Sequence, residues 1–374
     1  EVQTIASDAP AGGPAGRVGD RRVAPPSGAL EAASQLIAGA RRPVFVVGHG
    51  ARRDMPEVVA LAERLGAPVV TTFKAKGQIS DRHALGAGVL GRSGTPVASY
   101  FMNESDLLVA WGTSFSNHTG IAPYKPIVQI DDDPMALGRF HAVEVPVLGD
   151  VGVSAASIAD ALPEELAAVD QRGEVADRWE IWRNEKRSRV ADDRGRGVGA
   201  AALFDALGRH VDADAVICAD VGNNAYSFGR YFEVDHQTVL MSGYLGSIGF
   251  ALPAALGAWA AGGGRGRQVV AVAGDGGFGQ YAMELTTAVR HEMDIAVVLL
   301  DNSELGKISK EQRAGSFDVW QTGLVNPDFA GFARSCGALG IGVADRSQLD
   351  EALSAALGHR GPALVHVRSD VDLL

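Results

Sequence analysis

Short apolar segments that end in glycine alternate with amphipathic segments along most of this 374-residue chain, and this alternation restricts the fold more than any other feature. Segments 43–50 (PVFVVGHG) and 268–277 (QVVAVAGDGG) are apolar until they reach a glycine turn, which is typical of strands buried on both faces. Segments 55–66 and 249–263 have helical periodicity. Strands that alternate with helices predict parallel sheets with right-handed crossovers. We therefore predict an α/β fold with two doubly wound parallel-sheet domains joined by a helical connector.

The alternation occurs in two blocks, which set the predicted domain limits. Residues 1–28 are rich in Ala, Gly and Pro and lack a hydrophobic period, so we predict an exposed linker. The first α/β domain is predicted for 29–152, a polar connector for 153–196, and the second α/β domain for 197–374. The chain begins at Glu1 rather than at methionine, and we expect it to be a processed, cleaved or incomplete piece of a longer protein.

Composition excludes several classes of partner. Lys and Arg number 34 against 45 Asp and Glu, and the net charge of −11 argues against binding to nucleic acid or an anionic membrane surface. Cys218 and Cys336 lie far apart, so neither a disulfide framework nor a zinc knuckle is predicted. The chain has neither an apolar run long enough to span a membrane nor a signal-peptide pattern, and we predict a cytoplasmic protein.

Asp275 and Asn302 each follow an apolar strand, and one βα unit separates them. The carboxyl ends of neighbouring parallel strands meet at one edge of a sheet, where ligands bind. Gly274, Gly276 and Gly277 allow backbone amides to approach an anion, and the helix that follows offers its N-terminus to a phosphate. A carboxylate and an amide oxygen suit Mg²⁺. The combination predicts a Mg²⁺-bridged diphosphate, whereas a Gly-Asp-Gly segment alone would indicate only a turn or a helix cap.

The Gly274-Asp275-Gly276 motif, with Asn302 at this separation, resembles the thiamine diphosphate motif of the pyruvate oxidase, acetohydroxyacid synthase and benzoylformate decarboxylase superfamily. The resemblance covers nearly the whole chain and implies a central domain followed by a diphosphate-binding domain. It implies that Asp275 and Asn302 bind Mg²⁺ through their side chains and Glu304 through its main-chain carbonyl. Further cofactor contacts implied by the resemblance are Gly222, Asn223, Asn224, Leu305 and Gly306.

Segment 244–258 (YLGSIGFALPAALGA) is similar to the segment that holds the aminopyrimidine ring in this superfamily. The similarity implies that the Gly246 carbonyl accepts from the 4′-amino group, with Ser247 beside it. It also implies that Ile248 is the apolar wedge that bends the cofactor. By its own pattern the segment is a buried helix opened by glycine, and the two interpretations are compatible.

Members of this superfamily also carry an N-terminal domain, which binds the pyrimidine ring and supplies an activating glutamate. We expect that domain to lie outside this chain, in a separate subunit or in a cleaved or untraced segment, because the opening EVQ resembles its last strand. General acid–base groups contribute about 10²–10⁴-fold to rate, so this polypeptide alone is predicted to be inactive or nearly so. A site shared between subunits implies at least a dimer.

In flavin-containing members the central domain binds FAD, and several positions of this chain match theirs. Gly50 and Gly91 allow close backbone approach, Asp131 at a strand end can bind ribose hydroxyls, and Asp150 is suited to adenine. The full set of matching positions is Gly48, Gly50, Gly91, Gly112, Thr113, Asp131 and Asp150. Glycine turns are common in any α/β domain, and Ser114 replaces an arginine of acetohydroxyacid synthases. We predict FAD, with ADP and no ligand as the alternatives.

Segment 302–312 (NSELGKISKEQ) resembles phosphate-using pyruvate oxidases, which implies that Glu311 lines the active site; by its own pattern it is a solvated helix face. Lys307 occupies a position that is aromatic in those oxidases. The resemblance implies decarboxylation of a small, pyruvate-like 2-oxo acid, followed by protonation, oxidation or carboligation of the enamine. The alternatives are a non-catalytic cofactor-binding or regulatory subunit, and an enzyme of the 2-hydroxyacyl-CoA lyase or oxalyl-CoA decarboxylase type with ADP in the central domain.

Overall fold

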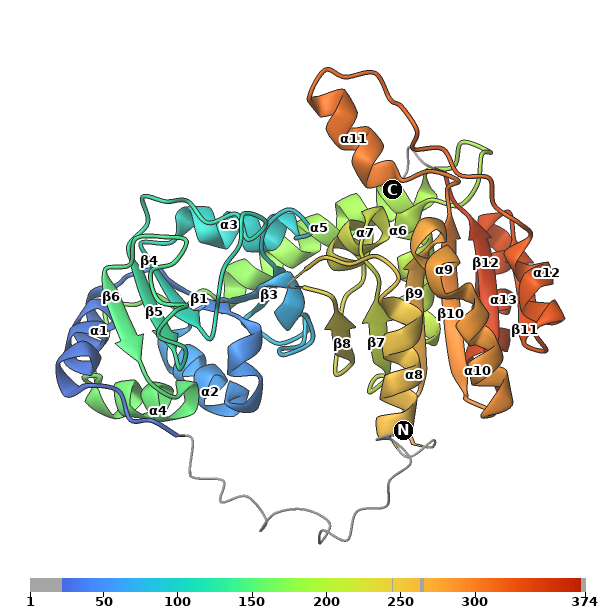
Figure 1. The fold of residues 1–374 in the computed structure, drawn as a ribbon. Helices are drawn as coiled ribbons and strands as arrows, with labels where there is room; N and C mark the ends of the chain where they lie inside the picture. The colour runs from blue at the N-terminus through green and yellow to red at the C-terminus, as the bar shows by residue number, and fades with distance from the viewer. Residues whose placement is uncertain (1–21, 244, 263–265, 371–374) are drawn as a thin grey trace, which may run out of the picture.

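The computed structural model describes residues 22–243, 245–262 and 266–370, which form two α/β domains side by side (Figure 1). Each domain is built on a six-stranded sheet whose paired strands are all parallel. Helices cover both faces of each sheet, so the predicted fold class is confirmed. Most of the predicted linker, with the opening EVQ, lies outside the described residues.

The sheet of the first domain has the strand order β3-β2-β1-β4-β5-β6, in which the direction of winding reverses between β1 and β4. Its strands alternate their side chains between two apolar layers, because successive residues of a strand point to opposite faces. Val44 and Val46 enter one layer, whereas Phe45 and Val47 enter the other. The strands are β1 (Pro43–Val47), β2 (Val69–Thr71), β3 (Gly86–Val89), β4 (Leu107–Trp111), β5 (Ile127–Asp131) and β6 (Val145–Leu148).

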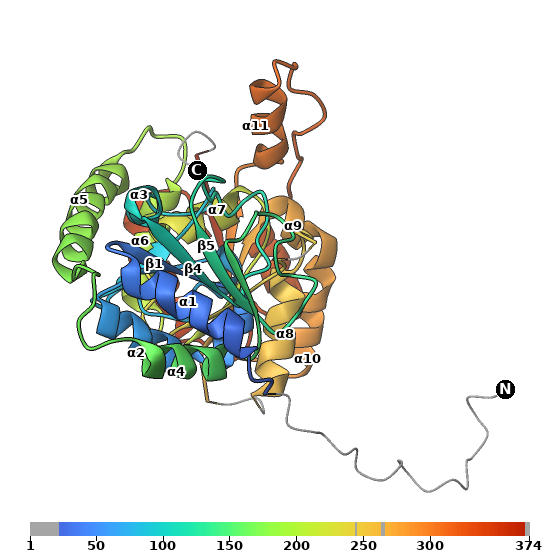
Figure 2. The same ribbon diagram turned by 90° about the vertical axis from the view of Figure 1, so that its left-hand side faces the viewer.

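Three helices cover the face to which Phe45 and Val47 point, and Figure 2 shows two of them, α2 and α4, side by side below the strands. These helices are α1 (Ser27–Gly39), α2 (Met55–Leu65) and α4 (Val151–Ala161). The opposite face is covered by α3 (Pro96–Glu104) and α5 (Arg172–Ala191). Two short 3₁₀ turns, η2 (His49–Arg53) and η3 (Phe73–Ala75), follow β1 and β2. Since Ala155 and Ile158 of α4 are fully buried against α1 and α2, and Leu162 is buried in the same layer, the packing of the first domain extends through α4 to Leu162.

The sheet of the second domain has the strand order β11-β12-β10-β9-β7-β8, so the winding direction reverses between β7 and β9. Ligands bind at such reversal points in open parallel sheets. The strands are β7 (Val216–Ala219), β8 (Thr238–Met241), β9 (Val269–Gly274), β10 (Ile295–Asp301), β11 (Leu339–Val343) and β12 (Ala363–Arg368).

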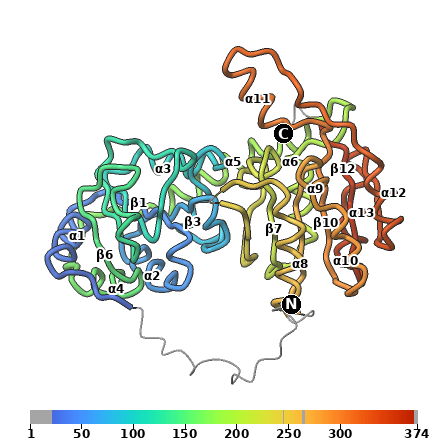
Figure 3. The backbone as a smooth tube through the Cα atoms, in the orientation of Figure 1, coloured from blue at the N-terminus to red at the C-terminus, as the bar shows by residue number. Residues whose placement is uncertain are grey.

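Two helical layers enclose the second sheet, and one helix stands apart from both. The apolar layer around α3 and α5 continues across the domain boundary into α6 (Ala200–His210), α7 (Asn223–Tyr231) and α13 (Leu349–Leu357). The other face carries α8 (Ala251–Ala261), α9 (Asp275–Tyr281), α10 (Leu285–Arg290) and α12 (Phe329–Ser335), with the 3₁₀ turn η4 (Ala282–Glu284) between α9 and α10. The turn η5 (Arg346–Gln348) precedes α13. Helix α11 (Gly306–Ala314) projects from the carboxyl edge of the sheet, as Figures 1 and 3 show.

Several elements were not predicted from the sequence. Strands β3 and β11 read GAGV and LGIGV, and glycine, which is rare in strands, concealed them. Helix α7 begins at Asn223, a residue for which only a cofactor contact was expected. Helix α9 begins at Asp275, inside the glycine turn rather than after it, because the Gly-Asp-Gly segment itself forms the first helical turn. No helix in the described part of the chain is long and apolar enough to cross a membrane.

A buried ion pair of the first domain lies at the domain boundary, where its aspartate contacts the second domain. Lys76 and Asp81 belong to the first domain, and their charged atoms lie 3.3 Å apart with side chains only 2% and 5% exposed. Asp81 Oδ2 also accepts from the Val234 N–H of the second domain at 2.9 Å, and the Asp81 N–H donates to the Val234 carbonyl at 2.9 Å. The domain boundary therefore contains a directional polar contact as well as a shared apolar layer.

Candidate cofactor site

The winding reversal of the second sheet brings three aspartates to one edge. Asp220 follows β7, Asp275 follows β9, and Asp301 ends β10. In the register of β9 and β10, Gly274 pairs with Leu300, so Asp275 and Asp301 come next on adjacent strands. Asp275 and Asn302 therefore do follow neighbouring strands.

Asp275 is 4% exposed, and its carboxylate is held from two sides. It accepts from the Gly276 N–H at 2.9 Å and from the Asn326 side-chain amide at 2.7 Å. The same Asn326 amide donates to Asp301 at 2.8 Å, so Asn326 bridges the two carboxylates. Burial raises the pKa of Asp275 to about 6. Burial alone would also raise the pKa of Asp301, but hydrogen bonds from His366, 2.8 Å away, and from Asn326 hold it below its usual value.

The loop after β10 is tied to a second segment, which fixes its main chain. The Leu305 N–H donates to the Thr322 carbonyl, and the Leu324 N–H donates to the Ser303 carbonyl, both at 2.8 Å. Ser303 has a φ of 53°, in the left-handed region. These contacts set the direction of the main-chain carbonyl of Glu304, the group expected to bind a metal.

Asn223 and Asn224 open helix α7, and both have a buried side-chain amide nitrogen without a hydrogen-bond partner. Asn223 is far from Asn302 in sequence but close to it in space. A Cβ added at Gly306 would lie 2.5 Å from the Asn223 amide nitrogen and 3.1 Å from that of Asn302. The structure therefore brings the predicted residues of α7 and of the β10 loop together around Gly306.

Unpaired buried amides are costly unless a ligand binds them, and they fit a diphosphate. The N-terminus of α7 adds main-chain N–H groups and the positive end of its helix dipole. Asp275 and Asn302 provide hard oxygen atoms suited to Mg²⁺. The described residues contain no cluster of three or more His, Cys, Asp or Glu side chains suited to a metal. The expected Mg²⁺ ligands do not require such a cluster, because only Asp275 among them binds through a carboxylate.

Asp220 anchors the segment that carries Gly246, Ser247 and Ile248, a role that was not predicted from the sequence. Its buried carboxylate accepts from the Gly249 N–H at 2.9 Å and from the Phe250 N–H at 3.3 Å. Burial raises the pKa of Asp220. The carboxylate thus fixes the entry to α8, three residues after Gly246.

The backbone conformation and the neighbouring contacts explain why two positions of this region are glycine. Gly246 has a φ of +65°, and its N–H donates to the Ser242 carbonyl at 3.1 Å. The Ser247 N–H donates to the Ser242 hydroxyl at 3.2 Å. A Cβ at Gly277 would lie 2.6 Å from the Asp220 carboxylate, so glycine is needed there for packing as well. A local signal for Asp220 existed in the sequence, since it ends an apolar strand in the same way as Asp275.

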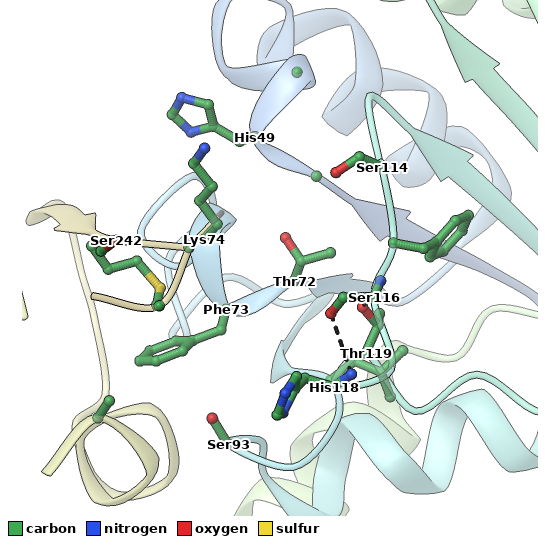
Figure 4. Close-up of a pocket in the computed structure, with 18 of the residues that line it drawn as sticks. His49, Thr72, Phe73, Lys74, Ser93, Ser114, Ser116, His118, Thr119 and Ser242 are labelled. Carbon is green, nitrogen blue, oxygen red and sulfur yellow. Dashed lines mark hydrogen bonds between the residues drawn. The ribbon is translucent and has the colours of Figure 1, made fainter. Parts of the chain in front are cut away.

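A cavity of about 380 Å³ lies between the domains, next to this site (Figure 4). In Figure 4, His49 and Lys74 stand on one side of the cavity, across from Ser114 on the other. Its lining includes four residues predicted to bind FAD and two predicted to bind thiamine diphosphate: Gly48, Gly50, Gly112, Asp131, Gly222 and Gly246. Burial raises the pKa of Asp131 to about 6, although the Asp133 N–H donates to it.

Three residues predicted to bind FAD do not line this cavity. Thr113 is fully buried, and its hydroxyl donates to the Val46 carbonyl at 3.1 Å. Asp150 caps α4 by accepting from the Val153 N–H at 2.9 Å. A Cβ at Gly91 would lie 2.0 Å from the His118 carbonyl, which indicates a packing role. Gly48 also has such a role, since its Cβ would lie 2.1 Å from the Gly112 carbonyl.

Glu311 lies on the exposed side of α11, where it forms an ion pair with Lys307, and it lines a second cavity of about 340 Å³. The hydrogen bond and charge of Lys307 lower the pKa of Glu311. The second cavity shares Asn223 with the site at the α7 N-terminus and Tyr226 with the first cavity.

Comparison with known proteins accounts for both domains. The family model of the thiamine pyrophosphate enzyme central domain matches residues 30–158, and that of the C-terminal TPP binding domain matches residues 220–367. The Bacillus subtilis (strain 168) protein YdaP, whose name describes it as thiamine pyrophosphate-containing, is 32% identical over 344 residues, which cover 90% of this chain and 58% of that protein.

Acetolactate synthase large subunits are similarly related. Isozyme 2 of Escherichia coli (strain K12) is 31% identical over 357 residues, which cover 92% of this chain and 63% of that subunit. The Corynebacterium glutamicum subunit is 32% identical over 341 residues, which cover 87% of this chain and 54% of that subunit. This chain thus spans somewhat more than half the length of these relatives. With both family models matched in order, the chain belongs to the thiamine pyrophosphate enzyme superfamily, of which it carries the central and C-terminal TPP-binding domains.

Proposed function

We propose that this protein is a thiamine diphosphate- and Mg²⁺-dependent enzyme that decarboxylates a small 2-oxo acid and then oxidises, protonates or carboligates the product fragment. The observation that carries the proposal is the pair of unpartnered, buried amides of Asn223 and Asn224 at the start of α7, of which Asn223 lies beside Gly306 and Asn302. The names of the related acetolactate synthase subunits support a reaction of this class. We also propose a cytoplasmic setting and an oligomeric assembly.

In this proposal each part of the site has a separate task. Asn223 and Asn224 donate to the diphosphate, while Asp275, Asn302 and the Glu304 carbonyl hold Mg²⁺. Asn326 would have to leave the space between Asp275 and Asp301, or share it, when the metal binds. The bound cofactor supplies an electron sink for the pair released as CO₂ leaves.

The segment anchored by Asp220 positions the other half of the cofactor. Gly246 would hold the aminopyrimidine through its carbonyl, with Ser247 beside it, and Ile248 would supply an apolar contact to the cofactor. Because Asp220 accepts two main-chain N–H groups of the next residues, this segment is held before any ligand binds. We propose that residues outside 1–374 hold the pyrimidine ring from the opposite side and provide the activating glutamate.

The cavity between the domains is proposed as the site of a nucleotide cofactor, with FAD favoured and ADP as the alternative. Gly50 and Gly112 leave room at the strand ends, and Asp131 can accept from ribose hydroxyls. Its position beside Gly222 and Gly246 would put a nucleotide close to the thiamine diphosphate site. Flavin absorbance in the purified protein would distinguish FAD from ADP, and from an empty site.

Thermal shift measurements test the central proposal. Saturating thiamine diphosphate with Mg²⁺ is expected to raise the melting temperature, because ligand at 100 times its Kd stabilises the folded state by about 2.7 kcal/mol. Asp275→Asn should remove most of that shift, since it removes the charge expected to face the metal. The control Asp345→Asn changes an exposed cap of the turn η5 and should leave the shift intact. An unchanged melting temperature in the parent protein would contradict the proposal.

The second candidate function is a non-catalytic cofactor-binding or regulatory subunit. This second function also predicts that the cofactor raises the melting temperature, but it predicts no release of CO₂ from any small 2-oxo acid. A screen of 2-oxo acids, with and without a separately supplied pyrimidine-binding domain, separates the two functions. We expect turnover only when that domain is present.

A further inference from the structure

A single side-chain amide, that of Asn326, joins two carboxylates at the expected metal site. Its nitrogen donates to Asp275 Oδ2 at 2.7 Å and to Asp301 Oδ1 at 2.8 Å. Both carboxylates are largely buried, and two negative charges this close repel each other unless a donor or a cation lies between them. Asn326 donates to both but carries no charge, so the pair keeps its attraction for a cation.

The donors around Asp301 distinguish it from Asp275 as a metal ligand. Besides the Asn326 amide, its Oδ1 accepts from the Ser303 N–H at 2.9 Å and from the Ser303 hydroxyl at 3.0 Å. Its Oδ2 accepts from His366 Nε2 at 2.8 Å. A carboxylate has about four lone-pair positions, and Asp301 already has four donors. Asp275 accepts two hydrogen bonds, which leaves lone pairs for a cation.

Contacts on both sides of Asn326 fix its position before any ligand binds. Two residues earlier in the chain, the Leu324 N–H donates to the Ser303 carbonyl at 2.8 Å. Three residues later, the buried Phe329 packs edge-on against the His366 ring, with ring centres 5.4 Å apart. His366 is also a donor to Asp301, so one packed unit holds the amide of Asn326 and the acid behind it.

We propose that Asn326 is a positioning residue that makes the metal site selective for Mg²⁺ over Ca²⁺, because it holds the Asp275 carboxylate in one orientation. Mg²⁺ requires a nearly ideal octahedral set of ligands, whereas Ca²⁺ accepts more ligands in a flexible geometry. A carboxylate fixed by an outer hydrogen bond therefore favours Mg²⁺, and one that can turn and bind through both oxygens favours Ca²⁺. Asn326 then stays between Asp275 and Asp301 when the metal binds. The inference rests on the proposed function, which assigns Mg²⁺ to this site.

Melting temperatures of the full chain test this proposal, recorded while Mg²⁺ or Ca²⁺ is raised at a fixed excess of thiamine diphosphate. Free cofactor binds metal equally in every sample, so differences between variants come from the protein. Asn326→Ala removes both hydrogen bonds, and it is expected to raise about tenfold the Mg²⁺ concentration needed for a given thermal shift and to raise that of Ca²⁺ clearly less. Asn326→Leu keeps the volume without the donors and should lose selectivity in the same way.

The control is Val325→Ala, which truncates the fully exposed neighbour of Asn326 and should change neither metal concentration more than about twofold. The melting temperature without ligand shows whether each variant is folded. A merely structural role of Asn326 would lower that temperature but leave the ratio of the two metal concentrations unchanged, and this result would overturn the proposal.

Tighter Mg²⁺ binding by Asn326→Ala would also overturn it, because Asn326 would then compete with the metal. Both of these results leave the proposed function standing, since the parent protein still binds Mg²⁺ with the cofactor. If Mg²⁺ and thiamine diphosphate do not raise the melting temperature of the parent protein, the proposed function falls and this inference falls with it.

Discussion

Asp220 shows how much one buried side chain can organise in this protein. Its carboxylate accepts from the N–H groups of Val221, Gly249 and Phe250, and thereby connects the end of β7 with the start of α8. Buried main-chain donors that lose their acceptor carry the full cost of desolvation. Asp220 therefore positions the segment of Gly246 to Ile248 without being part of it.

Replacement of Asp220 by alanine is expected to lower the free energy of unfolding by about 3 kcal/mol, since the buried N–H of Gly249 and the part-buried N–H groups of Val221 and Phe250 would lose their acceptor. Urea denaturation followed by circular dichroism measures the change. Asp150→Ala is the matched control, because it removes a single helix cap and should cost about 1 kcal/mol. Equal losses in the two variants would contradict the anchoring role.

Asp131 gives a prediction for pH dependence. Burial raises the pKa of its carboxyl from 3.8 to about 6, so the folded state disfavours the ionised form. The resulting loss of stability is absent below pH 3.8 and complete above about pH 6. As pH rises from 4 to 7, the free energy of unfolding of Asp131→Asn should therefore increase by about 1–2 kcal/mol relative to that of the parent. This gain is smaller than the full pKa shift implies, because the carboxylate borders a cavity open to water.

Denaturation curves of both proteins between pH 4 and pH 8 measure this difference. The slope of the difference with pH carries the test, since the substitution also has effects that do not depend on pH. A stability difference that stays constant over this range would show that Asp131 titrates normally.

At the scale of elements, the main chains at the carboxyl edge of the first sheet approach each other closely. The end of β1 lies so near the end of β4 that a Cβ at Gly48 would fall 2.1 Å from the Gly112 carbonyl. Gly112 itself has a φ of +57°. The reversal point of the first sheet therefore needs glycine for packing before any ligand is considered.

Gly48→Ala is expected to cost at least about 3 kcal/mol, because the rigid backbone on the opposite strand cannot yield as a side chain would. Gly39→Ala is the matched control: its Cβ would meet nothing within 4 Å at the end of α1, and it should stabilise the protein by roughly 0.5–1 kcal/mol. Thermal denaturation of the two variants compares them directly. A Gly48→Ala protein as stable as the parent would contradict the close approach of β1 and β4.

Local sequence explains most elements but not their partners. Strands β1, β9 and β10 are buried throughout most of their length, and their uniform apolar runs made them predictable. Strands β3 and β11 contain two glycines each, and they are strands because a neighbouring strand is there to pair with, not because of intrinsic preference. Helix α7 was concealed for a similar reason, since its first residues are the polar Asn223 and Asn224.

At the scale of the whole molecule, the Lys76–Asp81 pair is the buried polar contact at the domain boundary described above, and Asp81 links it to the second domain. Both side chains are almost completely buried, and Asp81 also accepts from the second domain. Removal of one partner leaves an uncompensated buried charge, whose cost is about 3–5 kcal/mol. The pair thus favours one arrangement of the two domains over other arrangements of the same apolar layer.

Lys76→Met is accordingly expected to destabilise the protein by about 3–5 kcal/mol and to make the interdomain segments more sensitive to protease. Glu185→Gln breaks the exposed pair with Arg189 and should cost less than about 0.5 kcal/mol. Limited proteolysis combined with urea denaturation measures both effects. A similar small loss in both variants would show that the buried pair does not stabilise the domain boundary.

The sequence by itself determined the fold class, the Gly274-Asp275-Gly276 turn and the separation of Asp275 from Asn302, because these features depend on periodicity and on residues close together in the chain. Tertiary structure decided the rest of the site. Asn326 and His366 reach Asp301 from distant segments, and Asp220 reaches forward to α8. The second cavity also forms only where Arg92 of the first domain meets Lys310 of the second. Strand order and domain packing bring such residues together, and neither leaves a local signal in the sequence.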